Sequence, residues 1–274
     1  MGLTGKIRKL LDPEARFRTA CEEKRRERNQ QRGFLLTPEA FMDGLDHTKL
    51  DAIRAKHSIP NPGIRIEKYL EMEKWLATNI RRVLNLGLDF QPPKRVLDLG
   101  SGAGYFLHVC KRLGHDVLAL DMHDPGAAWY VELLALFGVP RVTWRIDPFV
   151  PLPDLGAPFD YVTSYMVCFN RHIQPDIWKA EEWRFFLDDL WTRLKPGAIV
   201  WFELNPTPDG THYTPELQAF FESRGAIVDG KRLVWGLSET EYRVLLDLGR
   251  LESASVRKAT GARSSSEGEP AAAS

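Results

Sequence analysis

An acidic residue followed by three alternating glycines forms the part of this chain best suited to hold a ligand. Gly100, Gly102 and Gly104 come directly after the short apolar run at residues 95–99. A glycine-rich turn between a strand and a helix lets the backbone approach a ligand and presents N–H groups to it. Asp98, two residues before the first glycine, would repel phosphate but attract an ammonium or sulfonium group. We therefore expect a positively charged nucleoside here.

The residues around this turn predict a β-α-β unit over residues 94–124. Apolar residues at helical spacing follow the glycines, and a second apolar run at residues 117–120 ends at Asp121. Asp121 lies about twenty positions beyond the first glycine, as expected of a carboxylate that binds ribose hydroxyls. Tyr105 stands where a dinucleotide-binding turn would have Gly or Ala, which disfavours a pyrophosphate ligand. The alternative interpretation is a glycine-rich turn without a ligand.

The stretch VLDLGSGAGYF resembles the first motif of the class I methyltransferases that use S-adenosylmethionine. The resemblance covers residues 64–250 and implies a Rossmann-like, doubly wound α/β fold. Such a fold has a mostly parallel, seven-stranded sheet with helices on both faces. It further implies that Asp98 and the backbone of residues 100–104 hold the methionine end of S-adenosyl-L-methionine, and that Asp121 binds the ribose.

Apolar patterns further along the chain predict the remaining elements. We expect strands at residues 142–146, 159–165 and 198–204, and helices at about 125–138, 176–194 and 215–224. Residues 226–236 and 242–250 should supply the last strands, which pair antiparallel in this family. The resemblance implies that the acid after the third strand contacts the adenine amine. The expected cofactor-binding residues are Asp98, Gly100, Ser101, Gly102, Gly104, Asp121, Met122 and Asp147.

The segment after the fourth strand is the candidate catalytic site. Ligands of doubly wound sheets bind beyond the carboxyl ends of the central strands, so residues 165–172 should meet the methyl acceptor. The candidates are Tyr165, Asn170, Arg171 and His172. Only His172 has an ordinary pKa suited to a general base near neutral pH, although a lone histidine can equally be a packing or capping residue. The chain has TSYMVCFNRH rather than an NPPY-like tetrad here, which disfavours methylation of base or glutamine amines.

Three further polar residues, Glu203, Asn205 and His212, follow the fifth strand and could face the same cleft. Glu203 could act as a base or bind a divalent ion together with Asp147. The sequence contains no HxxE, CxxC or paired-carboxylate spacing, so we expect no metal.

The first 63 residues are predicted to form a basic helical extension. Basic side chains outnumber acidic ones between residues 5 and 32. One interpretation is a solvated helix that packs Ile7, Leu10 and Leu11 on the core; the other is a peripheral contact with an anionic lipid, a glycolipid or RNA. A short helix should follow Thr37 with Pro38 at its first position, and residues 66–84 have the spacing of an amphipathic helix.

Composition indicates one α/β domain, residues 64–250, between this extension and a low-complexity tail, residues 251–274, expected to be disordered. The 37 Lys and Arg residues balance 37 Asp and Glu residues, so no net charge favours nucleic acid or membrane. Three widely spaced cysteines indicate reduced thiols, and we find no signal peptide or spanning segment. We therefore expect a cytoplasmic protein with no transmembrane segment.

These observations predict an S-adenosylmethionine-dependent methyltransferase. The acceptor is expected to be a small molecule or a saccharide-like hydroxyl, with O-methylation favoured. Two alternatives remain: an RNA or protein methyltransferase that uses the basic arm, although nucleic acid is disfavoured, and a non-catalytic cofactor-binding protein. Methyl transfer from a sulfonium mainly requires that donor and acceptor be close and aligned, with a base if the acceptor is a hydroxyl.

Overall fold

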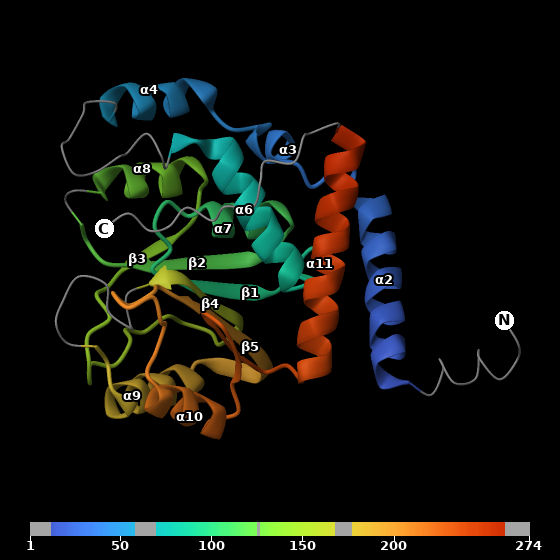
Figure 1. The fold of residues 1–274 in the computed structure, drawn as a ribbon. Helices are drawn as coiled ribbons and strands as arrows, with labels where there is room; N and C mark the ends of the chain where they lie inside the picture. The colour runs from blue at the N-terminus through green and yellow to red at the C-terminus, as the bar shows by residue number, and fades with distance from the viewer. Residues whose placement is uncertain (1–11, 58–69, 125–126, 168–176, 261–274) are drawn as a thin grey trace, which may run out of the picture. The chain divides into compact units, whose positions relative to one another are not determined.

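The computed structural model describes residues 12–57, 70–124, 127–167 and 177–260 (Figure 1). The chain forms two compact units. The helical unit contains the described residues up to Pro92, together with Arg112–Gly114 and those from Leu237 onward. The sheet unit contains the described residues of Pro93–Lys111 and His115–Gly236. The predicted limits of the methyltransferase domain, residues 64 and 250, stay a prediction.

The sheet unit is built on seven strands in the order β3-β2-β1-β4-β5-β7-β6. Strands β1 to β5 are parallel, whereas β7 is antiparallel to both β5 and β6. This confirms the predicted Rossmann-like, mostly parallel sheet. The strands are β1 (Arg95–Leu99), β2 (Asp116–Asp121), β3 (Arg141–Thr143), β4 (Phe159–Val167), β5 (Leu194–Leu204), β6 (Ile227–Asp229) and β7 (Arg232–Trp235).

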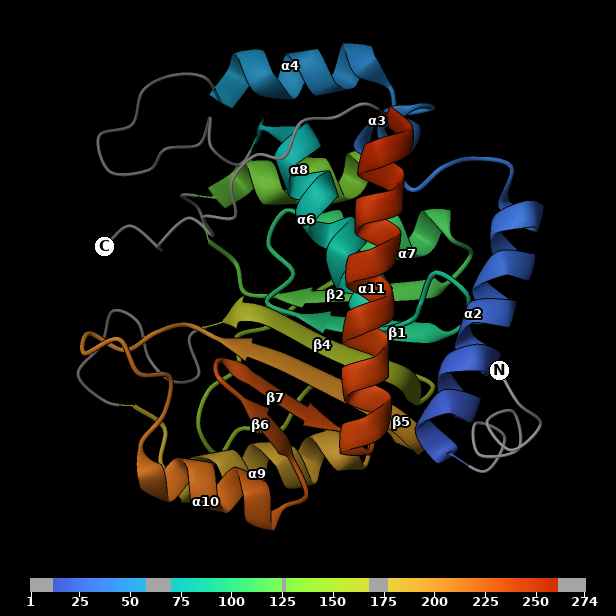
Figure 2. The same cartoon turned by 45° about the vertical axis from the view of Figure 1, so that its right-hand side comes forward.

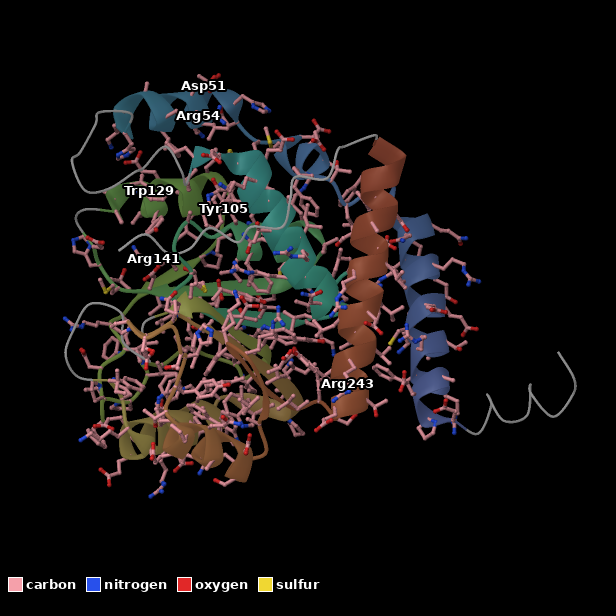
Figure 3. The ribbon with its side chains drawn as sticks, in the orientation of Figure 1. Asp51, Arg54, Tyr105, Trp129, Arg141 and Arg243 are labelled. Atoms are coloured by element: carbon pink, nitrogen blue, oxygen red, sulfur yellow. The ribbon has the colours of Figure 1, made fainter. Side chains whose placement is uncertain are left out.

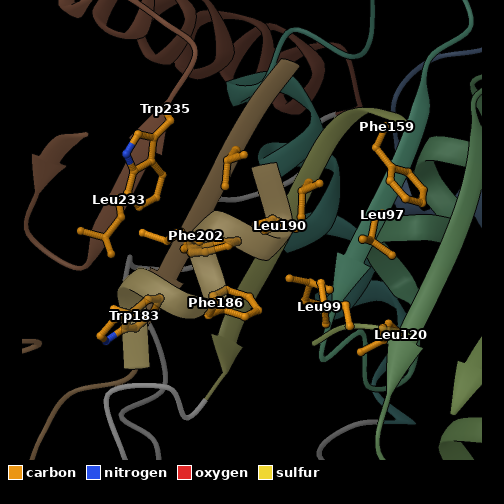
Figure 4. Close-up of a cluster of buried hydrophobic side chains, with 14 of the residues drawn as sticks. Leu97, Leu99, Leu120, Phe159, Trp183, Phe186, Leu190, Phe202, Leu233 and Trp235 are labelled. Carbon is orange, nitrogen blue, oxygen red and sulfur yellow. The ribbon is translucent and has the colours of Figure 1, made fainter. Parts of the chain in front are cut away.

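Helices cover both faces of this sheet. Helices α9 (Ala180–Trp191) and α10 (Pro215–Ser223) lie on one face, and α7 (Tyr105–Arg112) and α8 (Ala128–Leu136) lie on the other (Figure 1). The apolar stripe of α9 packs against side chains of β1, β5 and β7 in one buried cluster (Figure 4). Trp183 and Leu187 of that stripe are fully buried, so its aromatic residues form core, as the periodicity predicts.

The helical unit contains α2 (Pro13–Arg32), α3 (Pro38–Met42), α4 (His47–His57), α6 (Met72–Asn85) and α11 (Glu239–Thr260). Helix α11 packs against both α2 and α6, and α3 packs against α6 (Figures 1 and 2). The short helix predicted after Thr37 is confirmed, because the Thr37 hydroxyl accepts a hydrogen bond from the Ala40 backbone N–H. The amphipathic helix predicted from residue 66 is found as α6, and residues 66–69 lie outside the described residues.

Charged side chains attach α2 to the rest of its unit. Arg25 and Asp89 form a buried ion pair with 2.6 Å between Nε and Oδ2. Arg32 donates a hydrogen bond to the Asp89 backbone carbonyl, and Arg18 pairs with Asp247 of α11. Ile7, Leu10 and Leu11, predicted to pack on the core, lie outside the described residues.

The strand predicted at residues 242–250 is wrong, because this segment belongs to α11. Ser238 and Glu241 form a reciprocal cap: the Ser238 backbone N–H donates to the Glu241 carboxylate, and the Glu241 N–H donates to the Ser238 hydroxyl. This capping box starts a helix, and the apolar residues that follow pack against other helices. Because α11 continues to Thr260, the predicted disorder is also wrong for residues 251–260.

Three element limits also differ from the prediction. Strand β3 ends at Thr143, opposite Asp121, because β2 extends no further and leaves residues 144–146 without a strand to pair with. The helix predicted at residues 176–194 begins at Ala180 among the described residues and ends at Trp191. Strand β5 starts early, at Leu194, which pairs with Phe159.

No helix in the described part of the chain is long and apolar enough to cross a membrane. Two of the three cysteines, Cys21 and Cys110, are buried and unbridged. Burial raises the pKa of both thiols, so both stay protonated at neutral pH. Cys168 lies outside the described residues.

Candidate functional site

The glycine turn joins the carboxyl end of β1 to α7. Gly102 and Gly104 have φ values of 51° and 76°, which glycine adopts readily. A Cβ on Gly104 would lie 2.2 Å from Cδ2 of Leu134, so no side chain fits between the start of α7 and α8. At Gly102 the nearest atom to such a Cβ belongs to the Tyr130 ring, at 3.6 Å. Side chains of α8 and its neighbourhood thus pack closely against the backbone of the turn, which only glycine permits at Gly104.

The Asp121 carboxylate lies against this turn. Its Oδ2 accepts a hydrogen bond of 2.7 Å from the Gly102 backbone N–H, and its Oδ1 accepts one of 2.8 Å from the Met122 N–H. Burial raises the pKa of Asp121, while these two N–H groups and Arg141 oppose the rise. A carboxylate has about four acceptor positions, so two remain for ligand hydroxyls.

Asp98 points into the protein below the turn. Its side chain is only 3% exposed, and Oδ1 accepts a 2.7 Å hydrogen bond from the Thr163 hydroxyl. Its charge contributes to raising the pKa of the Cys110 thiol, which places it near α7. The Asp98 carboxylate thus lies inside the fold near the end of β1, and contact with a ligand stays a prediction.

Two buried hydroxyls near the turn have no hydrogen-bond partner among the described residues: those of Ser101 and Ser164. Ser101 belongs to the turn itself, and Ser164 pairs in register with Leu99, the last residue of β1. A buried polar group without a partner costs about 1–3 kcal/mol, so the site has capacity for a polar ligand. Together with the Asp121 carboxylate, the Ser101 hydroxyl fits an adenosyl amino acid.

Met122 and Asp147 follow the neighbouring strands β2 and β3. Met122 is 47% exposed, so its thioether offers an apolar surface next to Asp121. Asp147 lies beyond the end of β3 and pairs with Arg145 at 3.0 Å. Both residues therefore follow the carboxyl ends of parallel strands, the edge of the sheet at which the adenine contact is predicted.

The predicted catalytic segment is described only at its start. The Tyr165 ring packs edge-on against Phe106 of α7, with centroids 5.0 Å apart. The next residue, Met166, has the unusual φ of 61°, and its carbonyl accepts a 2.7 Å hydrogen bond from the Asn205 amide. Asn170, Arg171 and His172 lie outside the described residues.

The polar residues at and beyond the end of β5 have different environments. Glu203 pairs with Lys231 at 3.4 Å and with Arg232 at 3.3 Å, so its carboxylate already holds two cations. The Nδ1 atom of His212 is buried and lacks a hydrogen-bond partner in the described part of the chain. Among the described residues, no group of three His, Cys, Asp or Glu side chains could hold a metal ion.

Thr163, Ser164 and Arg141 lie beside the candidate site, and the sequence prediction did not name them. Thr163 and Ser164 lie on β4 opposite Asp98 and Leu99, so the parallel register brings them to the turn. If β1 is assumed to lie between β2 and β4, polar residues near the end of β4 can be predicted to lie beside the glycine turn. Arg141 had no such signal, because its contact depends on the pairing of β2 with β3.

The chain matches the family model described as a methyltransferase domain over residues 71–245, and it belongs to that family. The protein is an S-adenosyl-L-methionine-dependent methyltransferase. Its glycine turn, the Ser101 hydroxyl and Asp121 fit this cofactor. A search of curated proteins finds no match.

Several solved structures resemble the chain at low sequence identity. The ribosomal protein L11 methylase of Lactobacillus delbrueckii subsp. bulgaricus is 19% identical, with a TM-score of 0.38 over 57% of this chain and 76% of that one. DesVI of Streptomyces venezuelae is 16% identical, with a TM-score of 0.41 over 58% and 88%. A SAM-dependent methyltransferase of Aquifex aeolicus is 20% identical, with a TM-score of 0.39 over 56% and 86%.

Proposed function

We propose that this methyltransferase acts on a hydroxyl oxygen of a small-molecule or saccharide-like acceptor bound beyond the carboxyl ends of β4 and β5. The supporting observation is a pair of buried polar atoms, Ser164 Oγ and His212 Nδ1, without partners among the described residues. Both belong to segments that end at or follow this edge of the sheet. A hydroxyl both donates and accepts hydrogen bonds, so a polyhydroxylated acceptor can satisfy such groups.

In this proposal, each predicted cofactor-binding residue interacts with a particular part of the cofactor. The backbone of Gly100, Gly102 and Gly104, with the Ser101 hydroxyl, holds the methionine end, and buried Asp98 provides negative charge below it. Asp121 accepts hydrogen bonds from the ribose hydroxyls. Met122 covers one face of the adenine and Asp147 accepts from its amine. When bound, S-adenosyl-L-methionine supplies a methyl group on a positively charged sulfur.

On the acceptor side, His172 removes the hydroxyl proton, and Tyr165, Asn170 and Arg171 orient the acceptor. Substituting His172 with Ala should lower turnover at least tenfold, because general base catalysis contributes about 10²–10⁴-fold. Cofactor affinity should stay within twofold, since the base contacts the acceptor. Calorimetry and a methyl-transfer assay measure both; a fully active variant would reject His172 as the base.

The alternative of an RNA or protein substrate held by the basic arm loses support from α2. Arg25 and Arg32 bind Asp89, and Arg18 pairs with Asp247, so these cations serve the fold. Binding of RNA would weaken steeply between low and physiological salt. RNA retention at low salt that disappears at physiological salt would restore this alternative.

Labelled methyl transfer into a fractionated cell extract tests the acceptor class. The wild-type protein should label the small-molecule or saccharide fraction, and the labelled product should behave as an ether. Ser164→Ala and His212→Ala should reduce this labelling, whereas His47→Ala, an exposed histidine of α4, serves as a matched control. Label found only in RNA or protein, or on nitrogen, would contradict the proposal.

We also propose a cytoplasmic location. The reduced, buried thiols of Cys21 and Cys110 accord with it. Cell fractionation with an antibody against the full chain tests this proposal, and recovery only in a membrane or secreted fraction would overturn it.

A further inference from the structure

Arg141 connects two strands at the cofactor side of the sheet. It is the first residue of β3, an edge strand, and pairs with Ala119 of β2 (Figure 3). Its side chain extends along β2, where Nη2 donates a 2.6 Å hydrogen bond to the Met122 carbonyl and lies 3.5 Å from the Asp121 carbonyl. The guanidinium therefore contacts the backbone of Asp121, the last residue of β2, and of Met122, which follows it.

The Arg141 side chain retains unused hydrogen-bonding capacity. Its Nε is buried and has no hydrogen-bond partner in the described part of the chain. Among the described residues, its hydrogen bonds go to the backbone carbonyls of Asp121 and Met122 and not to a carboxylate. A partly buried guanidinium is costly to desolvate, so its position beside Asp121 is better explained by a role at the site than by strand pairing alone.

We propose that Arg141 is a positioning residue for cofactor binding, which holds the Asp121–Met122 backbone and stabilises the negative charge of Asp121 for the ribose hydroxyls. This inference rests on the ribose role proposed for Asp121. Arg141 acts through that carboxylate and needs no contact with the cofactor itself.

The charges around Asp121 come from three elements. Arg141 of β3 lowers its pKa, and so do the backbone N–H groups of Gly102 in the turn and Met122 after β2. Asp124, on the segment after β2, raises it, and burial raises it most. Removing Arg141 should therefore raise the pKa of Asp121 further. The carboxylate would then become protonated, and lose affinity for ribose hydroxyls, at a higher pH than in the wild type.

Calorimetric titration of S-adenosyl-L-methionine from neutral to acidic pH tests this role. Arg141→Met should weaken binding about tenfold at neutral pH, the equivalent of one charged hydrogen bond, and move the acidic loss of affinity to higher pH. Arg141→Lys should keep the position of that acidic limb while losing part of the affinity. Arg224→Met removes a cation that pairs with Asp188, far along the chain from the site residues, and should change neither.

Two results would overturn the proposal. One is wild-type affinity and pH profile in Arg141→Met; the other is weaker binding with an unshifted profile, which a purely structural role of the arginine would produce. If Arg141→Met does not fold, Arg141→Gln is compared with Arg141→Lys in the same titration. Asp121→Asn separates the ribose role of Asp121 from the positioning role of Arg141. Unchanged cofactor affinity in Asp121→Asn rejects the ribose role. Weaker binding in Asp121→Asn, together with wild-type affinity and pH profile in Arg141→Met, rejects only the role of Arg141.

Discussion

The helical unit and the sheet unit differ in how completely their buried polar groups are paired among the described residues. In the helical unit, Arg25 and Asp89 are 6% and 1% exposed, and both oxygens of Asp89 accept from the guanidinium. Arg25 also donates to the Leu248 carbonyl and lies 5.0 Å above the Phe90 ring. Burial raises the pKa of Asp89, and the positive charge of Arg25 counteracts this rise. The buried charges of this unit have found partners within the fold.

The sheet unit combines a dry apolar core with unsatisfied polar groups. Its α9 face is an aromatic and leucine cluster that includes Trp183 and Phe202 (Figure 4). Ser101 Oγ, Ser164 Oγ and His212 Nδ1, which lack hydrogen-bond partners among the described residues, belong to this unit. The comparison teaches that the helical unit pairs its buried charges within the fold, whereas the sheet unit also contains buried polar atoms that a ligand can satisfy.

The largest effect is expected from breaking the buried pair of the helical unit. Asp89→Ala leaves the Arg25 guanidinium buried without its partner and should lower the free energy of unfolding by about 3–5 kcal/mol. Urea unfolding measures this change. Arg18→Ala, which breaks a more exposed pair with Asp247, is the control and should cost less than about 1 kcal/mol. Equal losses of unfolding free energy in the two variants would mean that the buried pair stabilises the attachment of α2 no more than the exposed pair does.

A smaller effect, confined to ligand binding, is expected at Asp121 in the sheet unit. Asp121→Ala should weaken the binding of S-adenosyl-L-methionine by about 1.5–3 kcal/mol, because charged hydrogen bonds are lost. Calorimetry measures the affinity and thermal unfolding checks the fold. An unchanged dissociation constant would show that the ribose assignment is wrong.

The smallest effect should come from a group without a partner. Ser164→Ala should change the free energy of unfolding by less than about 0.5 kcal/mol, since no hydrogen bond to a described residue is lost. The matched variant Thr163→Val, at the adjacent residue, removes the donor to Asp98 and should cost about 1–3 kcal/mol. Denaturant unfolding of both compares them directly. A large loss of stability in Ser164→Ala would show that its hydroxyl is structural and not kept for a ligand.

Much of the fold follows from local sequence signals. The run from Arg95 to Asp121 predicts strand, turn, helix and strand, and all four are found close to the predicted limits. The wrong prediction at residues 242–250 came from treating an apolar run as a strand. Its missed signal was also local: Ser238 and Glu241 have the spacing of a capping box, which starts a helix.

The sequence alone determined the glycine turn, the acid before it and the acid that ends β2, because glycine conformations and strand ends depend on neighbouring residues. Only the tertiary structure decided that Asp98 is buried on Thr163, that Arg141 reaches the end of β2, and that Arg25 finds Asp89. These contacts join residues far apart in the chain. Strand register and helix packing bring them together, and both depend on the whole fold at once.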